Sequence, residues 1–222
     1  MPPAAAPHLQ EVKTSNIKGH FRVATPVSLP SADDEPRSFK RVTAHSNFWT
    51  VRPKHAVYDS LVFTVFPKSG YVNFSGVKNF GDCDAIKSEF ERLFGVRATS
   101  AVSVDNSTSS GRLPFARIPL ARLYWSVTGQ QQRQQPAGGG GGSCYPCTIS
   151  LRPHYFPSAL LRPNKACCKD IGTSILFPNG KFIVVGAKSP GQVARTARNL
   201  HRLVDATVAA AAATATAPSA TG

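Results

Sequence analysis

The sequence predicts an α+β protein built from two similar units, each with a mainly antiparallel sheet and helices on one face. Two observations predict this class. The stretch VFPKSGYVNFSGVKNFGDCDAIKSEFERLFG is repeated in outline as LFPNGKFIVVGAKSPGQVARTARNLHRLV. Each copy joins short apolar strands through Gly, Pro and Asn turns and continues in a helical pattern, which is typical of antiparallel sheets covered by helices.

The hairpin of each copy has the same spacing. An apolar strand ends in Phe-Pro, a turn containing Gly follows, and a second strand ends at Gly-x-Lys. In both copies a second glycine comes six residues after the first and a lysine two residues later: Gly70, Gly76 and Lys78, then Gly180, Gly186 and Lys188. Such spacing predicts a duplicated hairpin.

A helix is predicted after each hairpin, because apolar residues recur there at helical spacing. These residues are Ala85, Ile86, Phe90, Leu93 and Phe94 in the first copy, and Val193, Ala197, Leu200 and Val204 in the second. Asp82 or Asp84 could cap the first helix. Ser189 followed by Pro190 is a favourable opening for the second.

The repetition continues more weakly upstream. FWTVRP (residues 48–53) resembles FPSALLRP (156–163), and VKTSNIKGHFRV (12–23) resembles VSVDNSTSSGRL (102–113). The second alignment superposes Asn16 on Asn106. Each unit therefore reads as strand, helix, several strands and helix.

Low-complexity segments set the expected boundaries. The Gln- and Gly-rich stretch 128–143 predicts a flexible insertion, and the Ala/Thr-rich end is expected to fray after Val208. We expect a flexible N-terminus at 1–9, the first repeat at 10–97, the second repeat at 98–208, and a disordered tail at 209–222.

The composition points to a polyanionic partner. The chain has 26 Lys and Arg against 12 Asp and Glu, a formal charge of +14 and a pI near 10.0. Nucleic acid is the first candidate for such a surface, because cationic side chains neutralise phosphates. The hydrophobic content of 41% is enough for a packed core. No run of about 18 apolar residues predicts a membrane span, no secretory signal is visible, and an odd number of cysteines favours a reducing compartment.

The hairpin ILFPNGKFIVVGAKS resembles that of the TATA-box-binding protein family, which reads apolar-Ile-Phe-x-Ser-Gly-Lys-x-Val-x-Thr-Gly-Ala-Lys. YFPSALLRP is similar to that family's Phe-Pro-Gly-Leu-Ile-Tyr-Arg strand. The resemblance covers most of residues 10–205 and is strongest in the second repeat. It implies a saddle of about ten antiparallel strands with four helices on its convex face. It also implies binding of the duplex minor groove by the concave face.

The chemistry of minor-groove binding explains this motif. Small and β-branched side chains keep the sheet smooth, and a Phe at its end can wedge between base steps and kink the duplex. Asparagine amides reach the acceptors of A·T pairs, and Lys and Arg at the strand edges hold phosphates.

The resemblance assigns roles residue by residue. Phe156 and Phe177 match the intercalating pair. The groove contacts are Asn16, Asn106, Thr108, Asn73, Ser75, Ile183 and Val185. The phosphate contacts are Arg52, Arg162, Lys78, Lys181 and Lys188.

The first repeat departs from the family pattern. Counting back from its glycine and arginine gives Pro67 and Ser46 where the second repeat has phenylalanines, so Phe66 and Phe48 are out of register by one and two residues. Because a one-residue slip reverses the face of a side chain, we expect this half to lack its wedge. With Lys18 in place of another apolar contact, we also expect it to be more polar. The chain thus resembles a divergent TBP-related factor, such as the kinetoplastid type.

The resemblance also implies partners for the helices. Arg195, Arg198 and Arg202 recur on the exposed side of the last helix, as a solvated basic face or as a docking surface. The implied partners, beside double-stranded promoter DNA, are IIA- and IIB-like initiation factors or a small-nuclear-RNA-activating-type complex. We expect a nuclear protein that needs no cofactor and no small-molecule substrate.

Other function classes are less consistent with the sequence. Cys144 and Cys147 form a Cys-x-x-Cys half-site for zinc, but the adjacent Cys167 and Cys168 are a poor second half, so no metal is predicted. No His pairs with a nucleophile and an acidic residue in a recognisable motif, so we expect no enzyme. Two alternatives stay open: an adaptor that binds mainly transcription-factor proteins and has weak, nonspecific DNA affinity, and an accessory domain of a nucleic-acid enzyme.

Overall fold

The computed structural model describes residues 12–29, 38–54, 57–133, 147–151, 157–164, 168 and 170–215. The chain divides into two compact units. The N-terminal unit is Thr14–Thr108 with Lys188–Pro190, and the C-terminal unit is Met1–Lys13, Ser109–Ala187 and Gly191–Gly222. No helix within the described residues is long and apolar enough to cross a membrane.

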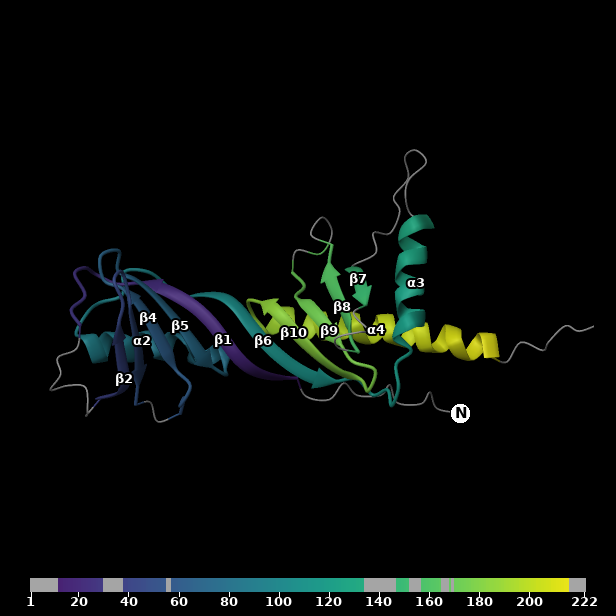
Figure 1. The fold of residues 1–222 in the computed structure, drawn as a ribbon, viewed down its shortest axis with the longest axis horizontal. Helices are drawn as coiled ribbons and strands as arrows, with labels where there is room; N and C mark the ends of the chain where they lie inside the picture. Colours follow the sequence, from purple (N-terminus) through teal and green to yellow (C-terminus); the bar gives the residue numbers. More distant parts are fainter. Residues whose placement is uncertain are drawn as a thin grey trace, which may run out of the picture. The chain divides into compact units, whose positions relative to one another are not determined.

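Ten strands make up the sheet (Figure 1). The first five are β1 (Lys13–Arg22), β2 (Phe39–Ala44), β3 (Trp49–Pro53), β4 (Val62–Phe66) and β5 (Tyr71–Val77). The others are β6 (Ser103–Arg112), β7 (Cys147–Leu151), β8 (Ala159–Pro163), β9 (Thr173–Leu176) and β10 (Lys181–Ala187). Their hydrogen-bonded order is β2-β3-β4-β5-β1-β6-β10-β9-β8-β7.

The strand order carries the duplication seen in the sequence. The order 2-3-4-5-1 of the first five strands returns in mirror sense as 6-10-9-8-7. The pairs within each set are antiparallel, from β2 with β3 to β5 with β1, and from β7 with β8 to β9 with β10. The predicted fold class, α+β with ten antiparallel strands in two similar sets, is confirmed.

The core of the N-terminal unit lies between its strands and α2 (Cys83–Phe94). Phe90 of α2 contacts Phe21 of β1 and Phe63 of β4 edge-on, with ring centroids 5.4 and 5.0 Å apart. All three rings are fully buried, and each such burial contributes about 1.5–3 kcal/mol. The helix therefore covers one face of this sheet. The opposite face, called here the open face, carries the alternate residues of the strands.

The C-terminal unit repeats this arrangement with α4 (Pro190–Ala215). The predicted apolar positions Val193, Ala197, Leu200 and Val204 are all buried. The backbone N–H of Gly172, just before β9, donates to Oγ1 of Thr196 on α4 at 2.9 Å. A second helix, α3 (Leu120–Arg133), meets α4 where Ser126 Oγ lies 3.4 Å from Thr207 Oγ1. These helices leave the alternate residues of β8, β9 and β10 on the open face.

Two helices continue beyond their expected ends. Three α-helices lie within the described residues, and the fourth predicted helix falls on the segment after β1, where residues 30–37 lie outside them. α3 continues through Arg133 into the predicted Gln-rich insertion, because glutamine is a good helix former. α4 continues to Ala215, past the expected fraying point at Val208, since alanine has the highest helix propensity.

Candidate nucleic-acid interface

The open face of the C-terminal unit is set by the alternation along β10. Phe182 and Val184 are buried on the helix side. Lys181 is exposed, and Ile183 and Val185 are half-buried on the opposite face. A strand places alternate side chains on opposite faces, so these three predicted contacts share the open face.

The hairpin turn brings Phe177 to the same face. The backbone N–H of Phe177 donates to the Lys181 carbonyl at 2.9 Å, and Gly180 N–H closes the turn on the Phe177 carbonyl at 3.1 Å. Phe177 therefore extends β9 by one position beyond the buried Leu176. It is half-buried at the strand end, which is the position the wedge role requires.

A hollow of about 540 Å³ gathers three of the predicted residues. Its lining is Lys13, Ser110, Gly111, Arg112, Phe177, Lys181, Phe182 and Ile183. Lys13 and Arg112 were not singled out from the sequence. Their strand positions could have indicated them, because Lys13 lies on β1 with Asn16 and Arg112 lies on β6 with Asn106. The hollow combines an aromatic ring, β-branched surface and three cations.

The remaining residues predicted for the second repeat are placed as follows. Arg162 is exposed on β8, next to the buried Leu161, and Lys188 is exposed just after β10. Thr108 on β6 is half-buried, and its backbone carbonyl accepts a hydrogen bond from Ser15 Oγ at 3.0 Å. Phe156 lies outside the described residues.

Polar side chains lie in the middle of the open face of the N-terminal unit. Along β5 the half-buried Asn73 and Ser75 alternate with the buried Val72 and Phe74. Lys18 of β1 is exposed opposite Ser75. A hollow of about 290 Å³ lies over them. It is lined by Lys18, Gly19, Val62, Thr64, Asn73, Phe74, Ser75, Asp105 and Asn106. Arg52 on β3 and Lys78 after β5 are exposed.

The two predicted central asparagines lie on the neighbouring strands β1 and β6. Asn16 accepts a hydrogen bond through Oδ1 from the backbone N–H of Gly76, at 2.8 Å. The side-chain amide oxygen of Asn16 therefore holds the end of β5 in place. Asn106 lines the hollow described above, on β6.

Phe66 lies on the open face, so its predicted reversal is wrong. It pairs with Tyr71 across the hairpin, as Phe177 pairs with Lys181 in the other copy. Along β4, Phe63 and Val65 are buried, whereas Thr64 and Phe66 are half-buried on the opposite face. The extra residue of this repeat lies in the turn, where the N–H of Gly70 reaches the Phe66 carbonyl at 3.0 Å. Counting back from glycine therefore misplaced the strand by one residue.

An aromatic cluster forms around Phe66. Its ring lies 5.6 Å from that of Phe48 and 6.3 Å from that of Tyr71, centroid to centroid. Phe48 in turn stacks on His45 at 4.3 Å. The sequence showed these residues only as out of register. The contact between strands β3 and β4 brings the two phenylalanines together.

The predicted partner-binding arginines lie on the helix side. Arg195, Arg198 and Arg202 are exposed on α4, at three- and four-residue spacing. Arg195 Nη1 lies 3.4 Å from Asp170 Oδ2, and both side chains are more than half exposed. Such a surface pair contributes little to stability. The three arginines are accessible from solvent because they are exposed.

No group of three His, Cys, Asp or Glu side chains able to hold a metal occurs within the described residues. Cys147 is buried at the start of β7, and burial raises the pKa of its thiol to about 11. Cys144 and Cys167 lie outside the described residues.

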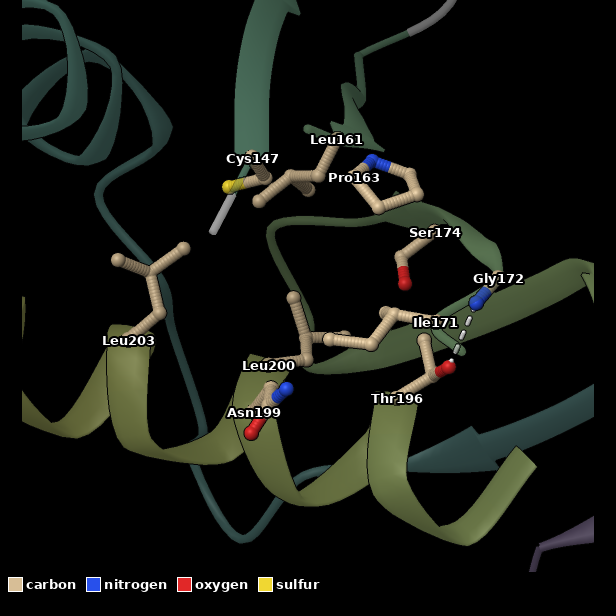
Figure 2. Close-up of a pocket in the computed structure, with 10 residues that line it drawn as sticks. All are labelled: Cys147, Leu161, Pro163, Ile171, Gly172, Ser174, Thr196, Asn199, Leu200 and Leu203. Atoms are coloured by element: carbon tan, nitrogen blue, oxygen red, sulfur yellow. Dashed lines mark hydrogen bonds between the residues drawn. The ribbon is translucent and has the colours of Figure 1, made fainter. Parts of the chain in front are cut away.

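A small pocket lies between α4 and the strands β7, β8 and β9 (Figure 2). Figure 2 shows Cys147, Leu161 and Pro163 facing Leu200 and Leu203 of α4 across it. Its cavity volume is about 40 Å³, far below the 300–1,000 Å³ of small-molecule sites. It is therefore a gap in the helix–sheet packing.

The fold is similar to that of a solved structure. The solved structure of Methanococcus jannaschii TBP matches with a TM-score of 0.58 and 15% sequence identity, over 88% of this chain and 99% of that one. No protein-family model matches the sequence, and no curated protein matches it. At this identity the likeness shows a TBP-like fold.

Proposed function

We propose that the chain is a TBP-like transcription initiation factor of the nucleus. It binds promoter DNA through the minor groove with its open faces and recruits other initiation factors through its helices. The observation that supports this most directly is the hollow around Phe177, Lys181 and Ile183, on the helix-free face of a TBP-like fold. Its chemistry matches what a bent minor groove requires.

The C-terminal unit supplies three kinds of contact. Ile183 and Val185 offer a smooth surface for sugars and base edges, and Lys13, Arg112 and Lys181 offer cations to phosphates. Phe177 at the strand end acts as the wedge. Unstacking a base step costs a few kcal/mol, which phosphate contacts and apolar burial offset.

The N-terminal unit supplies a second wedge. Phe66 occupies the hairpin position of Phe177, and Phe48 lies beside it, just before the neighbouring strand β3. Two neighbouring aromatic rings present a wider wedge than one ring. We therefore propose that the duplex is kinked by both units.

The helix side serves protein partners. Arg195, Arg198 and Arg202 form an exposed basic row on α4, which suits an acidic surface on an IIA- or IIB-like factor or on a small-nuclear-RNA-activating-type complex. This division of faces lets one molecule hold DNA and protein together.

One observation favours the adaptor as a second candidate. The open face of the N-terminal unit carries an ion pair between His20 and Asp105, where a minor-groove surface is expected to be apolar. An adaptor predicts that a promoter duplex binds no more tightly than random DNA at about 150 mM salt, while transcription-factor subunits are captured firmly.

The test is the bend angle of a labelled duplex, measured by fluorescence transfer between its ends. Phe177→Ala and Phe66→Ala are each expected to reduce the bend, and the double variant to reduce it further, because each removes one wedge. Trp125→Ala is the matched control, since Trp125 is 71% exposed on α3. An unchanged bend angle in both phenylalanine variants would contradict the wedge roles of Phe177 and Phe66. If the unmodified protein binds no duplex at all, the minor-groove function is excluded and the adaptor function is the one that agrees with the result.

A further inference from the structure

A row of polar side chains crosses the open face of the N-terminal unit. Thr64 of β4 pairs with Asn73 of β5, and Asn73 pairs with His20 of β1. His20 then meets Asp105 of β6, its Nδ1 lying 2.8 Å from Oδ1 and 2.9 Å from Oδ2. Four neighbouring strands thus each contribute one polar group to a single line across the sheet.

The Asp105 carboxylate is held in place by its neighbours. The His20 ring that binds it stacks on Tyr71 with centroids 4.9 Å apart, and the Arg22 guanidinium lies 5.8 Å from the centre of the Tyr71 ring. This stack fixes the imidazole, and the imidazole fixes the carboxylate. A positioned group of this kind can select a ligand, because little side-chain entropy is lost on binding.

The carboxylate also has room to accept another hydrogen bond. Asp105 lines the hollow of about 290 Å³ together with Lys18, Asn73 and Ser75, and it is the one acidic residue in that lining. Its side chain is 47% exposed, against 27% for His20. An ionised carboxylate offers about four lone-pair sites, so the bond to His20 leaves acceptor capacity toward the hollow.

The minor groove distinguishes base pairs by one donor. A·T and T·A pairs present only acceptors there, whereas G·C pairs add the 2-amino group of guanine. A carboxylate is acceptor-only. It can bond to that amino group, and it meets only repulsion from the negative potential of an A·T minor groove.

Resting on the minor-groove function proposed above, we infer that Asp105 reads the 2-amino group of guanine, so that the N-terminal unit selects duplex containing G·C pairs. Lys18 and Asn73, on the same face, supply donors to the base acceptors on either side. The two units then differ in what they read: an apolar wedge surface in one, and a guanine contact in the other. This assigns a sequence preference to the polar face.

The test changes only the minor-groove edge of the DNA. Binding of the full chain is measured by fluorescence anisotropy on two alternating duplexes, one of G·C pairs and one of inosine·C pairs, which lack the 2-amino group. A second pair compares A·T with diaminopurine·T, which gains it. Alternating duplexes present the same group at every register, so the position of the contact need not be known.

The unmodified protein is expected to bind the duplex with the amino group at least about fivefold more tightly in each pair, as one base-edge contact gives. Asp105→Ala is expected to bring both ratios close to one. Asp84→Asn is the matched control: it removes the same charge from the exposed first turn of α2, on the helix side, and should leave both ratios unchanged. The melting temperature of each variant reports that it folds.

The outcomes separate the two proposals. If the protein binds neither member of either pair, the minor-groove function fails. If it binds all four duplexes with equal affinity, or if Asp105→Ala keeps the preference, the guanine contact is overturned and the minor-groove function stands. Because each ratio is compared between variants on the same DNA, differences in duplex stiffness cancel.

Discussion

Single side chains fix the join between the strands and α2 of the N-terminal unit. The Tyr58 hydroxyl, in the segment before β4, donates a hydrogen bond to the Asp82 carboxylate at the start of α2. Burial and then this bond raise the pKa of Tyr58 to about 12. Burial likewise raises the pKa of the neighbouring Cys83 thiol to about 11. Both groups are therefore still neutral in the folded protein at pH values where the same groups in the unfolded chain already begin to ionise.

This has a consequence for alkaline stability. A group with a raised pKa in the folded state contributes fully below its ordinary pKa, and the contribution is lost as pH rises toward the folded value. For Tyr58 the window runs from about pH 10 to about pH 12. The free energy of unfolding should fall across it by less in Tyr58→Phe than in the unmodified protein, as measured by denaturant titration at each end. An equal fall in both proteins would contradict the role of Tyr58.

At the scale of elements, the two hairpins end in the same way. Gly76 and Gly186 close β5 and β10 with φ of 95° and 87°, a left-handed conformation that only glycine adopts readily. Their surroundings differ. A Cβ at Gly76 would overlap the backbone carbonyl of Ser60, whereas a Cβ at Gly186 would have no atom within 4 Å.

The two glycines provide a matched pair of variants. Gly186→Ala is expected to lower the free energy of unfolding by about 1–3 kcal/mol, which is the cost of the strained backbone alone. Gly76→Ala is expected to lower it further, because the strand must also move away from Ser60. Thermal or denaturant unfolding measures both. Equal losses would mean that the approach of Ser60 to Gly76 has no energetic consequence.

At the scale of the whole molecule, the net charge of +14 governs association with DNA. Seven phosphate contacts are proposed, the five from the sequence together with Lys13 and Arg112. They predict that log K falls with log salt at a slope of about −6.3. Lys181→Gln should reduce the slope by about one. Arg202→Gln, on the helix side, removes the same charge and should leave the slope unchanged. Fluorescence anisotropy at several salt concentrations measures all three, and a flat plot would exclude the phosphate contacts.

Much of the fold could be predicted because local patterns recur in the sequence. The spacing from Gly180 to Gly186 and the apolar positions of α4 depend only on neighbours along the chain, and both hold in the structure. The duplication together with the family resemblance predicted about five strands in each half, and the sheet has ten. The basic composition and the exposed lysines follow from the sequence in the same way.

The face of a side chain and its partners were decided only by tertiary structure. Counting residues placed Phe66 on the wrong face, because a turn absorbs an added residue while the strand keeps its register with β5. The contact of His20 with Asp105 joins two strands, and that of Phe48 with Phe66 joins β4 to the residue just before β3. Periodicity along one strand carries no information about its neighbour. The sequence by itself determined two basic, duplicated halves of sheet and helix; only the pairing of strands decided which side chains share the open face.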